Sequence, residues 1–190
     1  LGIPIALQNL LLALVGASDT IMLGSLDQNS MAAVSLATQI QFVQNLTVSG
    51  IIAAFHVLGA QYSGKEDRKS VNMVLCMTLR ICLVVSALTF LVCFSFPHMA
   101  LRIFTNVEEL VEIGVGYLKI ASFSYLISGI SQCFLAQIKL GKNTKKVATI
   151  SSIAVVLNIA LNAIFIFGLL SFPKMGVRGA ALATVISRVV

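Results

Sequence analysis

The sequence predicts an all-α membrane protein with six transmembrane helices. Of its 190 residues, 58% are hydrophobic and 11% are charged, whereas soluble domains have about 45–50% and about 25%. The mean hydropathy is +0.98, and the apolar residues gather in runs that reach the roughly 20 residues a membrane helix needs. A soluble enzyme, a nucleic-acid-binding module and a disordered regulator are therefore excluded.

Six apolar runs are expected to form the transmembrane helices. The second is the clearest, because residues 28–64 contain no Asp, Glu, Lys or Arg. The segments between the runs carry Gly, Pro and Asn, which mark turns. The expected spans are about 3–24, 31–61, 71–97, 109–139, 145–170 and 177 onward. Since the chain lacks an initial methionine and its sixth span stops after 14 residues, we expect a fragment of a longer protein.

Basic residues are distributed unequally among the loops. The second and fourth loops hold seven Lys or Arg residues, whereas the first, third and fifth hold three. The positive-inside rule therefore places loops two and four in the cytoplasm, so the chain begins on the cytoplasmic side. The net charge of +6 is interpreted as this topology signal, and no nucleic-acid partner is expected.

Acidic residues gather at the predicted start of the fourth span. Thr105 with Glu108, and Asn106 with Glu109, have the spacing of a capping box. In that motif a hydroxyl or amide side chain and an acid three residues later satisfy each other's backbone N–H groups. The acidic group is therefore interpreted as a device that starts a helix.

Apart from the acidic group that starts the fourth span, Asp19 is the only acidic residue within a predicted span. An ionisable side chain in the bilayer costs about 2.5–3.5 kcal/mol on insertion scales, so it is a functional candidate by default. Measured from the outer end of the first span, Asp19 lies about 7 Å deep. The alternative is an interfacial acid near the end of a helix.

Other polar residues are expected at a similar depth. Asn158 and Asn162 share one face of the fifth span, because they are four residues apart. They lie about 18 and 12 Å below its outer end, and Thr184 of the sixth span lies about 10 Å deep. A carboxylate, two amides and a hydroxyl form an oxygen-rich set that suits Na⁺ or a proton. The alternative is ordinary hydrogen bonding between helices, worth about 0.6 kcal/mol per bond.

The second span is polar on several sides, which a lipid-facing helix would not be. At least one of its faces is expected to line water or a cavity. The candidate lining residues are Gln39, Gln41, Gln44 and Asn45. Lys119 and Arg188 also lie within predicted spans, where each either pairs with an acid or lines the pathway.

The sixth span begins with small residues. These are Gly176, Gly179, Ala180, Ala181 and Ala183. Small residues allow helix backbones to approach closely in membranes. We therefore expect tight packing of this helix against its neighbours.

Patterns typical of enzymes are missing from the sequence. Gly141–Lys146 lacks the P-loop spacing, and no His/Cys cluster suggests metal catalysis. We expect a protein that is not an enzyme and that needs no cofactor other than a coupling ion.

Five stretches together resemble the multidrug and toxic compound extrusion (MATE) family over the whole chain. They follow one another in the order and spacing of that family. The stretches are Asp19–Gly24 (DTIMLG), Met31–Gln39 (MAAVSLATQ), Ala60–Gly64 (AQYSG), Asn158–Asn162 (NIALN) and Pro173–Thr184 (PKMGVRGAALAT).

The resemblance implies a fold and a site. Residues 1–190 would be the N-terminal six-helix lobe of a twelve-helix transporter with two lobes, and the C-terminal lobe would be absent from this chain. Asp19 would be the coupling carboxylate, and Asn158, Asn162 and Thr184 would complete the cation site, as the metal ligands if the ion is Na⁺. The backbone carbonyl of Ala180 is a further possible ligand. Some relatives carry Asp where this chain has Asn162, so the choice between Na⁺ and H⁺ stays open.

The resemblance also implies a function. The first hypothesis is an antiporter in a bacterial inner membrane that exchanges Na⁺ or H⁺ for small organic, often cationic or aromatic, compounds. The second is a flippase of the same superfamily for lipid-linked oligosaccharides, which would need several cationic residues facing its cavity. A third hypothesis, from another class of function and independent of the resemblance, is a channel or a membrane scaffold that does not transport.

Overall fold

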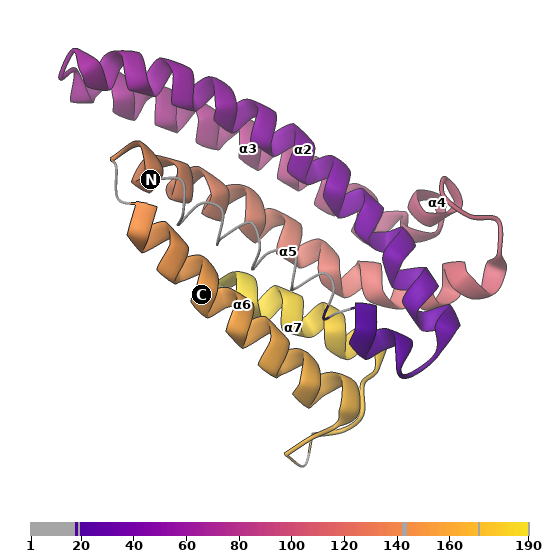
Figure 1. Ribbon diagram of the computed structural model, residues 1–190. Helices are drawn as coiled ribbons and strands as arrows, with labels where there is room; N and C mark the ends of the chain where they lie inside the picture. The colour runs from indigo at the N-terminus through magenta and orange to yellow at the C-terminus, as the bar shows by residue number, and fades with distance from the viewer. Residues whose placement is uncertain (1–17, 19, 142–143, 171, 190) are drawn as a thin grey trace.

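The computed structural model describes residues 18, 20–141, 144–170 and 172–189, which contain helices and no strand. Figure 1 shows one helical bundle in which α5 runs between the α2–α3 pair and the α6–α7 pair. The helices are α2 (Gln28–Gly64), α3 (Arg68–Ser95), α4 (Pro97–Arg102), α5 (Glu108–Leu140), α6 (Thr144–Phe167) and α7 (Val177–Val189).

The long helices follow the predicted spans closely. The span expected at 109–139 is α5, which runs from Glu108 to Leu140. Within the part of the chain that the structure describes, four helices, α2, α3, α5 and α6, are long and apolar enough to cross a membrane. Of the first predicted span, 3–24, the structure describes only residues 18 and 20–24, and these are helical. The prediction of an all-α membrane protein is confirmed.

Two aspartates fix the starts of α2 and α3. The Asp27 carboxylate accepts a hydrogen bond from the backbone N–H of Ser30 at 3.2 Å. The Asp67 carboxylate accepts one from the backbone N–H of Ser70 at 3.0 Å and another from its hydroxyl. Each side chain satisfies an N–H group that the first helical turn leaves unpaired. These hydrogen bonds hold the pKa of the Asp67 carboxyl below its usual value.

The start of α5 differs from the predicted capping box. The N-cap is Val107, and no side chain caps the helix there. Thr105 Oγ1 instead accepts a hydrogen bond from the backbone N–H of Val107 at 3.2 Å. Both carboxylate oxygens of Glu108 accept from Arg102 at 2.9 Å. Arg102 ends α4, a six-residue helix that lies within the link predicted between the third and fourth spans.

Glycines allow the helices to approach α5 and each other closely. A Cβ atom added to Gly129 of α5 would lie 2.1 Å from the Ser86 hydroxyl of α3. A Cβ atom on Gly179 of α7 would lie 2.7 Å from the backbone carbonyl of Phe165 in α6. Ala180, Ala181 and Ala183 of α7 are also buried. The predicted close packing of the small-residue helix is confirmed.

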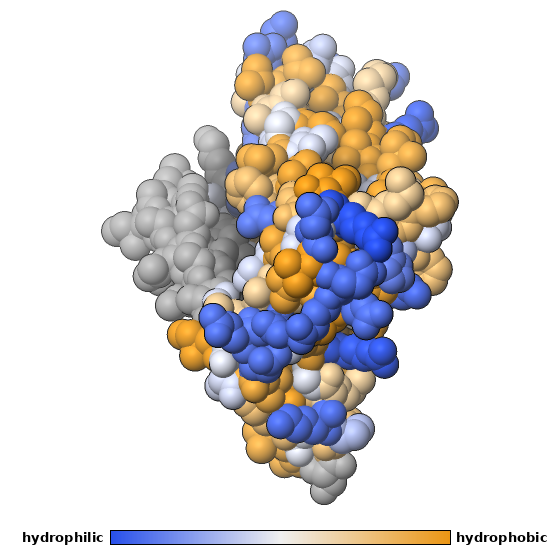
Figure 2. Space-filling model, turned by 90° about the vertical axis from the view of Figure 1, so that its right-hand side faces the viewer, coloured by the Kyte–Doolittle hydropathy of each residue, from blue (hydrophilic) through white to orange (hydrophobic). Residues whose placement is uncertain are grey.

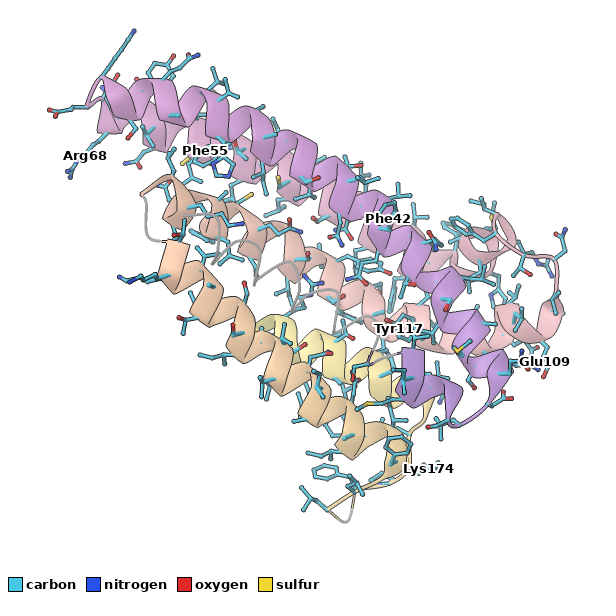
Figure 3. The ribbon with its side chains drawn as sticks, viewed as in Figure 1. Phe42, Phe55, Arg68, Glu109, Tyr117 and Lys174 are labelled. Atoms are coloured by element: carbon cyan, nitrogen blue, oxygen red, sulfur yellow. The ribbon has the colours of Figure 1, made fainter. Side chains whose placement is uncertain are left out.

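The ends of α2 and α5 lie side by side at both ends of the bundle. Asn29 donates a hydrogen bond to Glu109 at 2.8 Å, which joins their starts. A Cβ atom on Gly59 would lie 2.8 Å from the Leu140 side chain, so their last turns also meet. The turn that precedes α3 and the turn that follows α5 therefore lie at one end, as the alternating charge pattern of the loops requires. In Figure 3, Arg68 lies at this end and Glu109 at the opposite one.

The outer surface of the long helices is largely hydrophobic. Large side chains of α2 and α3 are exposed, among them Phe42, Leu46, Met77 and Leu88, and Figure 3 labels Phe42 on α2. Figure 2 shows a band of hydrophilic residues across the face with α4, with hydrophobic surface on both sides. Exposed apolar surface of this extent is expected where lipid covers the helices.

Candidate functional site

Two asparagines of α6 form the centre of a buried polar layer. Asn158 and Asn162 are 5% and 0% exposed, which is unusual for amide side chains. Their spacing of four residues places them on one face of the helix, as predicted. Asn162 Nδ2 donates a hydrogen bond to Asn158 Oδ1 at 3.1 Å.

The polar layer continues on α7. Asn158 Nδ2 donates a hydrogen bond to the Ser187 hydroxyl at 3.2 Å. The Ser187 hydroxyl in turn donates to the backbone carbonyl of Thr184 at 3.1 Å. The Thr184 hydroxyl donates to the backbone carbonyl of Ala180 at 3.0 Å, so both predicted α7 ligands lie on this face. The hydrogen bonds join α6 to α7 within the membrane-spanning part of the bundle.

The structure thus brings together Asn158, Asn162, Thr184 and Ala180, four of the five residues predicted for the cation site. Asp19 lies outside the described residues. The polar layer supplies amide, hydroxyl and carbonyl oxygens, which are the hard ligands that Na⁺ and protonatable networks use. Among the described residues there is no group of three or more His, Cys, Asp or Glu that suits a transition metal.

A second set of polar contacts begins at Arg188, the residue after Ser187. Arg188 Nη1 donates to the Ser128 hydroxyl of α5 at 3.3 Å. Gln132, one turn further along α5, donates to the same hydroxyl at 3.2 Å and to Asn45 Oδ1 of α2 at 3.3 Å. These contacts connect α7, α5 and α2 through side chains alone.

Two tyrosines of α5 lie near the Arg188 guanidinium. Tyr117 and Tyr125 lie within electrostatic range of Arg188, and Figure 3 places Tyr117 on α5 beside α7. Both tyrosines are buried. The Tyr125 hydroxyl has no hydrogen-bond partner among the residues that the structure describes. Lys119, which like Arg188 was expected within a span, is exposed on the surface of α5.

The polar residues of α2 do not all face one cavity. Gln39 is exposed and Gln41 is half-buried. Gln44 is buried, and its amide donates to the Ser86 hydroxyl of α3 at 3.2 Å and to the Tyr125 backbone carbonyl of α5 at 3.0 Å. Asn45 bonds to Gln132. Gln44 and Asn45 therefore join helices, which the sequence pattern did not indicate.

Comparison with known proteins places this arrangement in a family. The MatE sequence profile matches residues 4–164 of the chain. The chain belongs to the MatE family. It is 30% identical over 195 residues to the "Probable multidrug resistance protein NorM" of Thermotoga maritima. It is 28% identical to the "Multidrug resistance protein MdtK" of Yersinia enterocolitica over 97% of its own length.

Solved structures show the same fold for this MatE chain. It aligns over its whole length with an outward-facing multidrug resistance MATE family transporter of the MOP superfamily, at a TM-score of 0.89 and 22% identity. A MATE protein in the straight conformation gives a TM-score of 0.88. The chain spans about 41% of the relatives' length. The prediction of one six-helix lobe of a two-lobe fold is confirmed, and its limits at residues 1 and 190 stay a prediction.

Sequence reasoning missed Ser187 and Ser128 in this MatE lobe. Ser187 follows Thr184 by three residues, so both lie on one face of α7. This spacing could have predicted that Ser187 belongs to the polar layer. Ser128 had no such signal, because serines are common in membrane helices and the partner Arg188 lies 60 residues away. Its role depends on how α5 and α7 pack.

Proposed function

We propose that this MatE chain forms the N-terminal lobe of a cation-coupled antiporter that exports small organic compounds, cationic or aromatic in character. The observation that carries the proposal is the buried layer of Asn158, Asn162, Thr184 and Ser187 between α6 and α7. Polar groups at this depth are costly and mark ion pathways in membrane proteins. The relatives named as multidrug resistance proteins support the export of drugs.

The coupling ion would bind between Asp19 and the polar layer. Asp19 would supply the charge, and Asn158, Asn162 and Thr184 would supply neutral oxygens, with the carbonyl of Ala180 as a further ligand. This set suits Na⁺ directly, and it suits H⁺ if Asp19 takes the proton and the amides stabilise its neutral form.

Ion binding would require the polar layer to rearrange. Asn158 Oδ1 accepts a hydrogen bond from Asn162, and the Ala180 carbonyl accepts one from Thr184. An ion that takes either oxygen as a ligand competes with these hydrogen bonds. An ion that reorients Asn158 would also disturb its hydrogen bond to Ser187, which joins α6 to α7. The ion-bound and ion-free lobes would then prefer different helix arrangements. Coupling requires such a difference in affinity between two states.

The rest of the transporter would come from outside this chain. Since the chain spans about 41% of its relatives' length, a second lobe would complete the pathway for the substrate. The lobe would lie in a cell inner membrane with lipid around α2 and α3 and with its N-terminus in the cytoplasm. The basic turns before α3 and after α5 would then face the cytoplasm.

A second candidate function is the flippase for lipid-linked oligosaccharides. Arg188 favours it, because this cation lies within the lobe and its hydrogen bond goes to a neutral hydroxyl. A guanidinium is well suited to hold a phosphate. Lys119, the other basic residue expected within a span, is exposed. It therefore adds nothing to the support that Arg188 gives to the flippase.

The test is efflux of a fluorescent cationic dye from cells that express the protein from its own gene. Na⁺ and pH gradients are imposed separately, and Asp19→Asn and Asn162→Ala are compared with the unchanged protein. Asn72→Ala is the matched control, because Asn72 is an exposed asparagine of α3. We expect efflux to follow one gradient, to stop in the first two variants and to continue in the control.

The outcomes separate the candidates. Efflux that persists in Asp19→Asn and Asn162→Ala contradicts the proposed ion site. Absence of efflux under both gradients, with membrane expression confirmed, contradicts the exporter and leaves the flippase and the scaffold. Transfer of a phosphate-bearing lipid that stops in Arg188→Gln would then support the flippase.

A further inference from the structure

The second half of the chain carries basic residues and no acidic ones. From residue 113 to residue 190 the sequence contains no Asp or Glu, whereas it contains eight Lys or Arg residues. Four of the eight are lysines between residues 139 and 146, where the chain passes from α5 to α6. This end of the bundle therefore has a local excess of positive charge that its own segment does not balance.

The rest of the described chain does not balance Lys145 and Lys146 either. Within the residues that the structure describes, the one ion pair joins Arg102 to Glu108. That pair lies at the opposite end of the bundle, where α5 begins. At the near end, the two acidic residues of the α2–α3 turn are outnumbered by the three basic residues of the same turn. The two lysines are therefore available to an anion from outside the chain.

Lys145 and Lys146 lie at an accessible hollow in the surface of α6. Its volume is about 380 Å³, and the described residues that line it are Lys145, Lys146, Thr149 and Ile150. All four are exposed. The Thr149 hydroxyl donates its hydrogen to the Lys145 backbone carbonyl at 3.0 Å, so the two ammonium groups supply the donors. An ammonium group has three N–H donors and no acceptor, and the hollow therefore suits an anionic acceptor such as a phosphate.

The two lysines lie at the depth of lipid headgroups. Helix α6 has 24 residues, which gives a length of about 36 Å at 1.5 Å per residue. The hydrocarbon core of a bilayer is about 30 Å thick, and the headgroup layers extend it to about 40–45 Å. A helix of this length that crosses the core places its first turn, with Lys145 and Lys146, among the headgroups of one leaflet.

Exposed apolar side chains continue from the lysines toward the middle of α6. Ile150, Ile153 and Val156 are 37%, 53% and 66% exposed. They follow Lys146 by four, seven and ten residues, so helical spacing places them on one side of the helix. The hollow and these side chains together fit a molecule that is anionic at one end and apolar along the rest of its length.

We propose that the first turn of α6 binds the phosphate group of an anionic phospholipid. The phosphate pairs with Lys145 and Lys146, and an acyl chain lies along Ile150 and Ile153. Basic clusters at the membrane surface attract anionic lipids in this way. Phosphatidylcholine is a poorer ligand, because its own ammonium group already balances its phosphate. The site is separate from the polar layer between α6 and α7, and it does not depend on the proposed transport function.

Quenching of a tryptophan reporter measures which lipid occupies the hollow, because the chain contains no tryptophan of its own. Ile150→Trp places an indole there in the protein expressed from its own gene, and the signal of the protein without the reporter is subtracted. The protein is held in nanodiscs of phosphatidylcholine mixed with phosphatidylglycerol, whose headgroup is anionic. Bromine atoms, which quench the indole, are placed on the acyl chains of one lipid and then of the other. The two quenching curves give the relative affinity of the site for the two lipids.

We expect phosphatidylglycerol to be favoured about fivefold for each lysine that its phosphate contacts. The double variant Lys145→Gln with Lys146→Gln should remove that preference. Lys65→Gln with Lys69→Gln is the matched control, because these exposed lysines lie at the α2–α3 turn. The control removes the same charge from the same end of the bundle, so it matches any effect on membrane insertion, and it should keep the preference.

Each alternative result contradicts the proposal. Equal quenching by the two lipids means that the hollow does not recognise a negative charge. A preference that persists without Lys145 and Lys146 assigns the phosphate to other residues. An equal loss in the control variant means that the overall surface charge attracts the lipid and that no site exists. A preference that disappears when glycerol 3-phosphate is added at constant ionic strength means that a soluble phosphate compound is the ligand.

Discussion

Replacing Gly179 with alanine should separate α6 from α7 and damage the polar layer. The added Cβ atom would lie 2.7 Å from both the backbone carbon and the oxygen of Phe165, and 2.9 Å from its Cβ. Backbone atoms cannot rotate away as a long side chain can. Ordinary contact begins at 3.4 Å, so the helices must move apart by about 0.7 Å.

The magnitude follows from this displacement. Overpacking of a tight contact costs about 1–3 kcal/mol. The Asn158–Ser187 hydrogen bond spans 3.2 Å, and a rigid separation would lengthen it to about 3.9 Å, which is beyond bonding distance. That loss adds about 0.6 kcal/mol, so the free energy of unfolding should fall by roughly 2–4 kcal/mol.

Thermal unfolding in detergent, followed by circular dichroism, measures the effect. The midpoint of Gly179→Ala should fall by at least about 4 °C, since 1 kcal/mol corresponds to about 2–4 °C for a chain of this size. Gly50→Ala is the matched control, because a Cβ atom at Gly50 meets nothing within 4 Å. A midpoint for Gly179→Ala equal to that of the control would refute the close approach of α6 and α7.

Two further predictions concern α3. Gly129→Ala brings a Cβ atom to 2.1 Å from the Ser86 hydroxyl, so it should destabilise the lobe by about 1–3 kcal/mol. Adding Ser86→Ala to the same chain should restore part of that loss. If the changes in unfolding midpoint of the two single variants simply add up in the double variant, the contact between the two residues is contradicted. The Asp67 carboxyl has a lowered pKa because Ser70 donates hydrogen bonds to it, so it stabilises the folded state above its unfolded pKa of about 4. That contribution is lost as the pH falls through the lowered native pKa. The difference in the free energy of unfolding between the unchanged chain and Asp67→Ala should therefore shrink in acid. Unfolding measured across a range of pH tests this.

The positions of the long helices could be predicted because apolar runs end at polar turns. The start of α2 lies slightly earlier than expected, at Gln28, since Asp27 caps the helix through Ser30. The short helix α4 could not be predicted from periodicity, because six residues are less than two turns. The capping box at Thr105 was wrong because Glu108 pairs with Arg102 instead of reaching back to the N-cap.

Part of the candidate site could be predicted because helical spacing determines which residues share a face. Asn158 and Asn162 meet for this reason. The role of Gln44 could not be predicted in the same way. Its two bonds go to Ser86 and to the backbone of Tyr125, which lie 42 and 81 residues away. Only the packing of α2 against α3 and α5 shows that this amide is an internal crosslink with one acceptor left over.

The two polar sets of the lobe meet at successive residues of α7. Ser187 accepts from Asn158 of α6, and Arg188 donates to Ser128 of α5. Successive residues on a helix point in different directions, so α7 is bonded to α6 on one side and to α5 on another. A displacement of α7 that changes the first contact therefore also changes the second, and Gln132 extends the second to Asn45 of α2. These hydrogen bonds, linked through the backbone of α7, would give the ion binding proposed at α6 and α7 a physical route to α2, a helix with exposed polar residues that include Gln39.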